Sequence, residues 1–136
     1  MGAWSHEPFG NDTAGDWSYG LLETQDLSSI ESALDAVAEV GEDYLEADLA
    51  SEAIGAIEVL AKLLGKGTQS DAYTEDIDQW VKDHPLQPSA ELLAKARRAI
   101  ERIQSPDSEL LELWDEGGEA DAWKASLFQL LTATNP

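Results

Sequence analysis

The side chains of this chain that can do chemistry are mostly carboxylates. The 136 residues include 28 Asp and Glu, 8 Lys and Arg, 2 His and no Cys. Carboxylates at helical spacing can share a proton or hold a hard cation, and Asp12 and Asp16 beside Asn11 form one such group. In so acidic a chain this spacing also arises by chance, and no Asp-x-Asp-x-Asp-Gly loop of the kind that binds calcium is present. We therefore predict no metal site.

Other catalytic arrangements are also missing from the sequence. His6 and His84 have no His or Glu three or four residues further on, so the ligand spacing of a zinc site is absent. No Ser stands in a Gly-x-Ser-x-Gly turn, and no Cys is present to act as a nucleophile. The segment 65–67 is Gly-Lys-Gly but lacks the strand and the Lys-Ser/Thr pair of a phosphate-binding loop. We predict no catalytic residue and no cofactor.

The few basic residues are concentrated in one helical segment. Lys95, Arg98 and Arg102 share a helix face at three- and four-residue spacing, with Arg97 beside them. Such a basic patch can hold a phosphate or the acidic surface of a partner. It can equally pair with the acidic half of its own chain, and we favour this second interpretation.

The distribution of charge narrows the choice of partner. The formal net charge is −20, the isoelectric point is near 4.1, and residues 1–61 contain no Lys or Arg. Such a field repels nucleic acids and anionic membranes, and it favours encounter with a basic protein. A candidate face for such a partner is formed by Glu39, Glu42, Asp43 and Glu46, which lie near one another in the chain. The alternative is that the acidity serves only solubility or reflects a salty host.

The pattern of apolar residues predicts helices throughout. Apolar side chains recur every three or four residues, and no segment alternates in the manner of a strand. We expect an all-α fold, a compact single-domain bundle over residues 1–136 with six to seven helices around a central helix near residues 48–64. Expected helix starts, from capping residues and proline, are Asn11 or Asp12, Ser28 with a capping box to Glu31, Asp48, Thr74, Ser89, and Ser105 followed by Pro106.

The expected central helix is apolar except for one narrow line of residues. Ser51, Gly55, Glu58 and Lys62 follow one another at three- and four-residue spacing. This pattern is typical of a helix that other helices surround, with one stripe left for polar contacts.

A cluster of large and capping residues stands at the beginning of the chain. Pro8 opposes a helix there, and the cluster consists of Trp4, Phe9, Asn11, Asp12, Asp16 and Trp17. In the structural interpretation, which we favour, Trp4 and Phe9 fold back over the first helix near Trp17 and the Asn-Asp pair sets the turn. In the functional interpretation, Asn11, Asp12 and Asp16 form a polar site beside an aromatic pocket.

This opening resembles that of a bacterial family of unknown function. Gly2-Ala3-Trp4, Phe9, Asn11-Asp12, Ala14 and Asp16-Trp17 are similar to the family's opening pattern, Gly-Ala-Trp-Gly-x-Gly-x-Phe-x-Asn-Asp-x-Ala-x-Asp-Trp. The segments 44–61 and 96–114 are similar to the middle and the C-terminal part of the same family. Ser5 and Glu7 replace two glycines of the pattern, so an anion-binding nest of backbone amides is not expected. The resemblance implies a small bacterial cytoplasmic helical protein and supplies no reaction, so no catalytic residue is carried over.

Two function classes follow from these observations. The first is a non-enzymatic protein-binding module, for example an inhibitor or immunity-type protein that neutralises a basic partner. The second is an enzyme or metal-dependent protein with a site near Asn11, Asp12 and Asp16. A cleft that joins those residues to Arg97 or Arg98 would favour the second class. No secretory signal and no long apolar run are visible, so we expect a cytoplasmic protein that contacts neither membrane nor nucleic acid.

Overall fold

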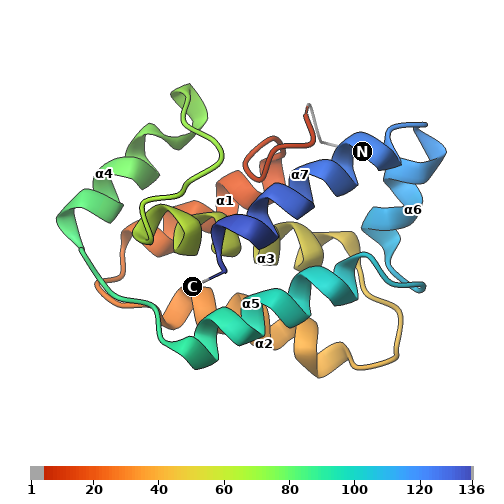
Figure 1. The fold of residues 1–136 in the computed structure, drawn as a ribbon, viewed down its shortest axis with the longest axis horizontal. Coiled ribbons are helices and arrows are strands. Elements are labelled where there is room, and N and C mark those ends of the chain that lie inside the picture. The colour runs from red at the N-terminus through yellow and green to blue at the C-terminus, as the bar shows by residue number, and fades with distance from the viewer. Residues whose placement is uncertain (1–4, 136) are drawn as a thin grey trace.

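The computed structural model describes residues 5–135 of the chain. Within that range the chain forms only helices, which confirms the all-α prediction (Figure 1). No helix in the described part is both long and apolar enough to cross a membrane. The elements are α1 (Asp12–Leu22), α2 (Ser28–Val40), α3 (Ala47–Leu63), the 3₁₀ turn η1 (Ala72–Thr74), α4 (Glu75–Asp83), α5 (Ala90–Ile103), α6 (Glu109–Glu116) and α7 (Ala120–Ala133).

Helix α3 is the centre of the bundle, as the sequence predicts. It contacts each of the other six α-helices, and in Figure 1 it runs between α1 and α7 on one side and α2 and α5 on the other. Apart from the half-buried Glu52, every residue from 50 to 61 is buried. Many of these residues are Ala, whose small side chains let neighbouring helices approach the α3 backbone on all sides.

The polar stripe expected along α3 is not a surface stripe. Ser51, Gly55 and Glu58 are all buried, as expected of a helix that other helices surround. Gly55 is the point where Phe9 approaches the helix, because a Cβ built at this glycine would lie 3.1 Å from Phe9 Cε1. The gap in the sequence pattern is thus a packing site for an aromatic ring.

Glu58 is the polar group around which the connection after α3 is folded. Its side chain has no exposed surface, and its Oε2 accepts hydrogen bonds of 2.8 Å from the backbone N–H groups of both Thr68 and Gln69. Its Oε1 accepts from the Thr68 hydroxyl at 2.7 Å. A buried carboxylate has to be compensated in this way, because an unpaired buried charge is strongly unfavourable.

Lys62 extends this network to α4. Its Nζ lies 3.6 Å from Glu58 Oε2 and 2.6 Å from Asp78 Oδ1, and it also donates to the carbonyl oxygen of Gln69. The other oxygen of Asp78 accepts from the Thr74 hydroxyl at 3.0 Å. One buried cation thus ties α3, the loop that follows it and α4 together.

Gln69 connects the same network to the N-terminal segment. Its side chain is buried, and its Oε1 accepts a 2.8 Å hydrogen bond from the backbone N–H of Phe9, which is 60 residues away in the sequence. Burial of Phe9 against Gly55 and this hydrogen bond together fix the approach to α1.

Helix starts agree with the sequence expectations only in part. Asn11 and Ser89 cap α1 and α5, their side chains accepting from the N–H groups of Ala14 and Leu92 at 2.8 and 3.1 Å. The expected starts at Ser28 and Thr74 are found too, since α2 begins at Ser28 and Thr74 directly precedes α4, but the capping box of α2 and the expected caps Asp48 and Ser105 were wrong. Glu46 rather than Asp48 precedes α3, Asp26 rather than a Ser28–Glu31 box binds the Ser28 N–H at 3.0 Å, and α6 begins at Glu109 after the Ser105-Pro106 segment. Tertiary contacts set the starts of α3 and α6, whereas the Asp26 contact at α2 is local.

The Glu58 network gives a testable prediction about stability. Glu58→Gln preserves the shape of the side chain but places an amide NH₂ where a carboxylate oxygen now accepts hydrogen bonds. At least one of the donors from Thr68 and Gln69 is then left without an acceptor, so we expect the free energy of unfolding to fall by about 1–3 kcal/mol in urea denaturation. Glu52→Gln is the matched control on the same helix and should change it by less than about 0.5 kcal/mol.

The same variant tests the effect of pH. Burial raises the pKa of Glu58 above the ordinary value of 4.5, more strongly than Thr68, Gln69 and Lys62 lower it. The folded chain therefore binds this proton more tightly than the unfolded chain, and the contribution of Glu58 to stability falls as pH rises from 4.5 through the raised pKa. The difference in unfolding free energy between the parent and Glu58→Gln should shrink over that range. A difference that grows instead would show that the carboxylate is better stabilised folded than unfolded.

Candidate functional site

The N-terminal cluster divides into buried and exposed residues. Phe9 is 2% exposed and packs on α3, whereas Asp12 and Asp16 are exposed on α1. Trp17 is half-buried against the core and lines a hollow with the start of α2. Trp4 lies outside the described residues.

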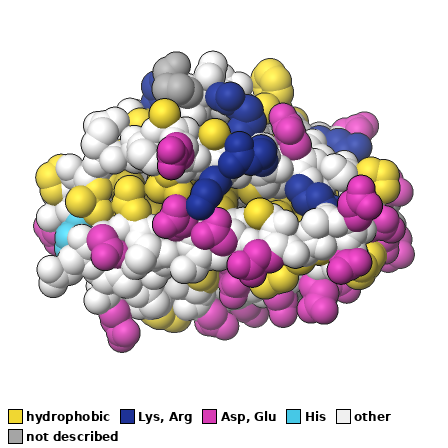
Figure 2. All heavy atoms as spheres, turned by 90° about the horizontal axis from the view of Figure 1, so that it is seen from below, with side chains coloured by type: hydrophobic (Ala, Val, Ile, Leu, Met, Phe, Trp, Pro, Cys, Tyr) yellow, Lys and Arg dark blue, Asp and Glu magenta, His cyan; other side chains and the backbone are white. Residues whose placement is uncertain are grey.

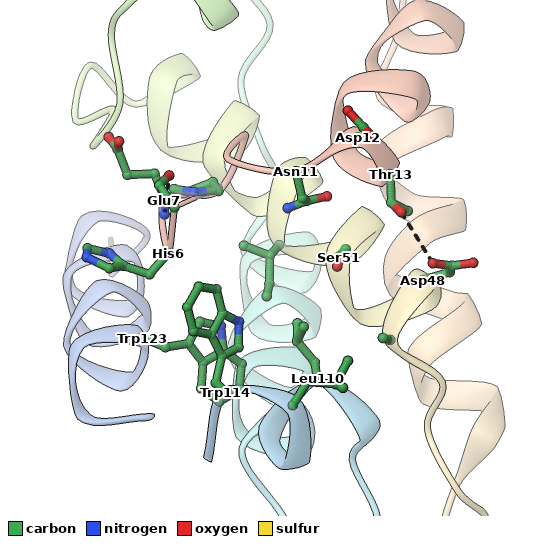
Figure 3. Close-up of a pocket in the computed structure, with 15 residues that line it drawn as sticks. His6, Glu7, Asn11, Asp12, Thr13, Asp48, Ser51, Leu110, Trp114 and Trp123 are labelled. Carbon is green, nitrogen blue, oxygen red and sulfur yellow. Dashed lines mark hydrogen bonds between the residues drawn. The ribbon is translucent and has the colours of Figure 1, made fainter. Parts of the chain in front are cut away.

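A small cavity lies beneath this segment, between α1, α3, α6 and α7 (Figure 3). Two buried indole rings, of Trp114 from α6 and Trp123 from α7, lie side by side below Asn11, and Ser51 of α3 forms part of the wall. The cavity has a volume of about 70 Å³. This is enough for a few water molecules and well below the roughly 300–1,000 Å³ of typical small-molecule sites.

Some of the polar side chains around the cavity are engaged in local structure, whereas His6, Glu7 and Asp12 line it without such a contact among the described residues. Asn11 caps α1, and the Thr13 hydroxyl donates to Asp48 Oδ1 at 3.3 Å, which links the first turns of α1 and α3. In Figure 3, Asp12 points away from the two indoles. The contacts of Asn11 and Thr13 thus join helix ends, and His6 and Glu7 of the N-terminal segment also line the cavity.

The three polar residues of the cluster do come together in a second hollow, on the other side of α1. Asn11, Asp12 and Asp16 line a groove of about 290 Å³ together with Tyr73 of η1 and Asp76 of α4. Sequence reasoning missed Tyr73 and Asp76, because they are some 60 positions away and are brought here by the folding of the α3–α4 connection onto Glu58. Neither Arg97 nor Arg98 lines this groove. In the described part of the chain, no group of three or more His, Asp or Glu side chains is arranged to hold a metal ion.

The candidate acidic face lies on the end of α2 and on the connection to α3. All four side chains that define it, Glu39, Glu42, Asp43 and Glu46, are exposed. None of these carboxylates forms an ion pair or a side-chain hydrogen bond with any residue between 5 and 135. The sequence correctly places them close together because they follow one another in a short segment.

The connection that carries the acidic face is fixed to the α5–α6 connection. Leu45 is fully buried, its N–H donates to the Asp107 carbonyl at 2.8 Å, and its own carbonyl accepts from the Glu109 N–H at 2.9 Å. The Ala47 N–H at the start of α3 donates to the Glu109 carboxylate at 2.8 Å. These contacts make a single parallel bridge between two loops that are far apart in the sequence.

Arg102 fixes the other half of the same connection. Its guanidinium donates to the carbonyl oxygens of Gly41 at 2.9 Å and Asp43 at 2.6 Å, and more weakly to those of Pro106 and Asp107. An arginine with five fixed donors suits this role, because it can hold several carbonyl groups at once. Sequence reasoning placed Arg102 in a basic patch and missed its contact with the acidic face.

Tyr44 anchors the centre of the face to α6. The ring is 48% exposed, and its hydroxyl donates to Glu112 Oε1 at 2.9 Å. Partial desolvation, the hydrogen bond to Glu112 and the nearby Glu109 and Asp107 charges together raise the pKa of Tyr44 to about 12. The phenol therefore stays protonated and keeps donating over the whole physiological range.

The remaining members of the basic patch have different partners. Lys95 forms ion pairs with Glu31 Oε2 at 3.0 Å and Asp35 Oδ1 at 2.9 Å, both on α2, as expected of a patch that pairs with the acidic half. These carboxylates raise the pKa of Lys95. Arg97 donates to the Asn135 side chain at 3.0 Å. The side chain of Arg98 contacts no hydrogen-bonding or ion-pair partner in the part of the chain that the structure describes.

Comparison with known proteins gives one match. The model of a family described as Domain of unknown function (DUF4259) matches residues 2–126, almost the whole chain. No curated protein and no solved structure matches. The family resemblance inferred from the sequence is thereby confirmed at the level of the family.

The environment of Tyr44 gives a prediction for the acidic face. At about pH 11, between the ordinary phenol pKa near 10 and the raised value of about 12, most Tyr44 hydroxyls should still be protonated. The ¹³Cζ resonance of Tyr44, assigned by its loss in Tyr44→Phe, should then keep its neutral-pH position. A Glu112→Gln variant removes one negative charge beside the hydroxyl and should shift the titration to lower pH. If the resonance in the parent has already moved fully at about pH 11, Tyr44 is not held by Glu112 in solution.

Proposed function

The chain belongs to the DUF4259 family, and we propose that it is a non-enzymatic protein-binding module, an inhibitor or immunity-type protein whose partner is basic. The acidic face of Glu39, Glu42, Asp43 and Glu46 is its contact surface. The observation that carries this proposal is that four exposed, unpaired carboxylates stand on a connection that other parts of the fold hold in place.

Most carboxylates of the described residues have no ion-pair partner within the fold, and this supports a role for the negative charge in binding. In residues 5–135 only four carboxylates take part in ion pairs, those of Glu58, Asp78, Glu31 and Asp35. The four carboxylates of the acidic face have no ion-pair partner among the described residues, because the guanidinium of Arg102 beside them binds backbone carbonyls and not the side chains. Its field is thus available to an external basic group.

The rigidity of the connection supports a specific contact. Arg102, the Leu45 bridge and the Tyr44–Glu112 hydrogen bond fix the segment 41–46 before any partner binds. Ordering a flexible loop on binding costs free energy that is subtracted from the affinity, and a loop held in advance avoids most of that cost. The half-exposed Tyr44 ring adds an aromatic contact of the kind enriched at protein interfaces.

The charge of the whole chain favours a basic protein over other partners. A net charge of −20 repels nucleic acids and anionic lipid surfaces, and it accelerates encounter with a positively charged protein. The other function class, an enzyme with a site near Asn11, Asp12 and Asp16, has weaker support. The groove that these residues line does not extend to Arg97 or Arg98.

Salt and charge reversal test this proposal. A pull-down from the native host at low ionic strength should recover a basic protein that is released as salt passes about 0.15 M, where the Debye length is roughly 8 Å. Reversing three charges, in Glu39→Lys, Glu42→Lys and Asp43→Lys together, should weaken the complex by about tenfold or more, chiefly through a slower association rate. The far-UV circular dichroism should be unchanged, because all three side chains are exposed.

A second triple variant controls for net charge. Asp115, Glu116 and Glu119 are also exposed, at the far end of α6, and their reversal to lysine changes the total charge equally. Binding that survives this change and is lost in the first variant locates the contact on the acidic face. Equal loss in both variants, or a partner insensitive to salt, would refute the proposed surface.

A further inference from the structure

A groove with an apolar floor runs between α2 and α5, on the face that Figure 2 shows. Its floor is formed by the buried Val37 of α2 and Ala99 of α5, with the exposed Ala38 beside them, and Asp35, the ion-pair partner of Lys95, also lines it. The groove has a volume of about 290 Å³. Along its α5 side stand the three residues of the basic patch, Lys95, Arg98 and Arg102. In Figure 2 the Lys and Arg side chains gather on this face beside hydrophobic surface, with acidic side chains around them.

The three basic residues differ in how far their charge is already used. Lys95 is neutralised by its ion pairs with Glu31 and Asp35. Arg102 is occupied by backbone carbonyls, which satisfy its donors but carry no net charge. Arg98 is exposed and has no partner for its guanidinium among residues 5–135. The groove therefore combines apolar surface with one arginine whose donors are all available.

We infer that this groove binds a small organic monoanion, a carboxylate with a short hydrocarbon body. The carboxylate lies against the Arg98 guanidinium, which can donate two parallel hydrogen bonds to its oxygens. The hydrocarbon body lies on Val37, Ala38 and Ala99. This site is independent of the acidic face proposed above for a protein partner.

The size and the charge of the chain both favour a small ligand. The groove volume is close to the lower end of small-molecule sites, which begin at about 300 Å³. An acidic protein, a nucleic acid or an anionic membrane carries many charges, and each is repelled by the net charge of −20. A single carboxylate experiences little of that repulsion, and the local charge of the α5 face attracts it. The apolar floor in turn disfavours a bare inorganic anion.

Titration with straight-chain carboxylates tests the site. We would titrate the ¹⁵N-labelled full chain with hexanoate and octanoate and follow ¹H–¹⁵N shifts. Octanoate should bind saturably, with shifts concentrated at residues 35–41 and 95–102. Each fully buried CH₂ contributes about 0.8 kcal/mol, about fourfold in affinity, so octanoate should bind at least about fourfold tighter than hexanoate even when half-buried. A parallel titration with octyl phosphate compares the affinity for a phosphate head group with that for a carboxylate head group.

Arg98 and its neighbour form a matched pair of variants. Arg98→Gln removes the free guanidinium and should weaken octanoate binding by about tenfold or more. Arg97→Gln removes the same charge from the next position, which is also exposed but does not line the groove, and should change binding by less than about twofold, as expected of a screened distant charge. Ala38→Glu places a negative charge in the groove at an exposed position and should abolish binding, whereas Ala122→Glu on the exposed surface of α7 should not.

Several results would overturn the inference. These are non-saturable binding, shifts elsewhere than the groove, equal losses in Arg97→Gln and Arg98→Gln, or octanol binding as tightly as octanoate. Tighter binding of octyl phosphate than of octanoate would overturn the choice of a carboxylate. Because the assay contains no protein partner, its failure leaves the proposed function of the acidic face unaffected, and failure of the pull-down leaves this site unaffected.

Discussion

The fold depends on one buried carboxylate. Glu58 lies on the central helix with no exposed surface, and it is compensated by Thr68, Gln69 and Lys62. These partners come from the loop after α3, and through Lys62 and Gln69 the same network reaches α4 and the N-terminal segment. A charge in such a position must be fully paired, so the loop has essentially one arrangement in which the core can close.

This constraint also determines which surfaces form on the α1 side of the molecule. The loop that Glu58 holds ends in η1 and α4, whose Tyr73 and Asp76 complete the groove with Asp12 and Asp16. Phe9, held by Gln69 and seated on Gly55, directs the chain into α1 and lines the groove on that side of α1. Phe9 and Asn11 of the N-terminal cluster are thus used in packing and capping, whereas Asp12 and Asp16 stay exposed.

At the opposite end of the bundle the charges are distributed unevenly. Helix α5 carries four of the eight basic residues, and it uses them in different ways. Lys95 holds α2 through two carboxylates, and Arg102 holds the connection after α2 through carbonyl groups. Arg98 remains over an apolar groove, and the neighbouring acidic face keeps its charge. Two surfaces of opposite character therefore lie next to each other, and both are positioned by contacts that α5 makes with α2.

The sequence by itself determined the class of fold, the position of the central helix and the family, because helical periodicity, capping residues and a run of buried small residues are local signals. It also located the acidic face, whose members are neighbours in the chain. Tertiary structure alone decided that Glu58 is buried, that Arg102 binds carbonyls, and that Tyr44 reaches Glu112. It also decided where α3 and α6 begin, since Glu109 and the Leu45 bridge set those ends. The physical reason is that each of these contacts joins residues from different elements, and a one-dimensional pattern records the type of a side chain without the partner that compensates it.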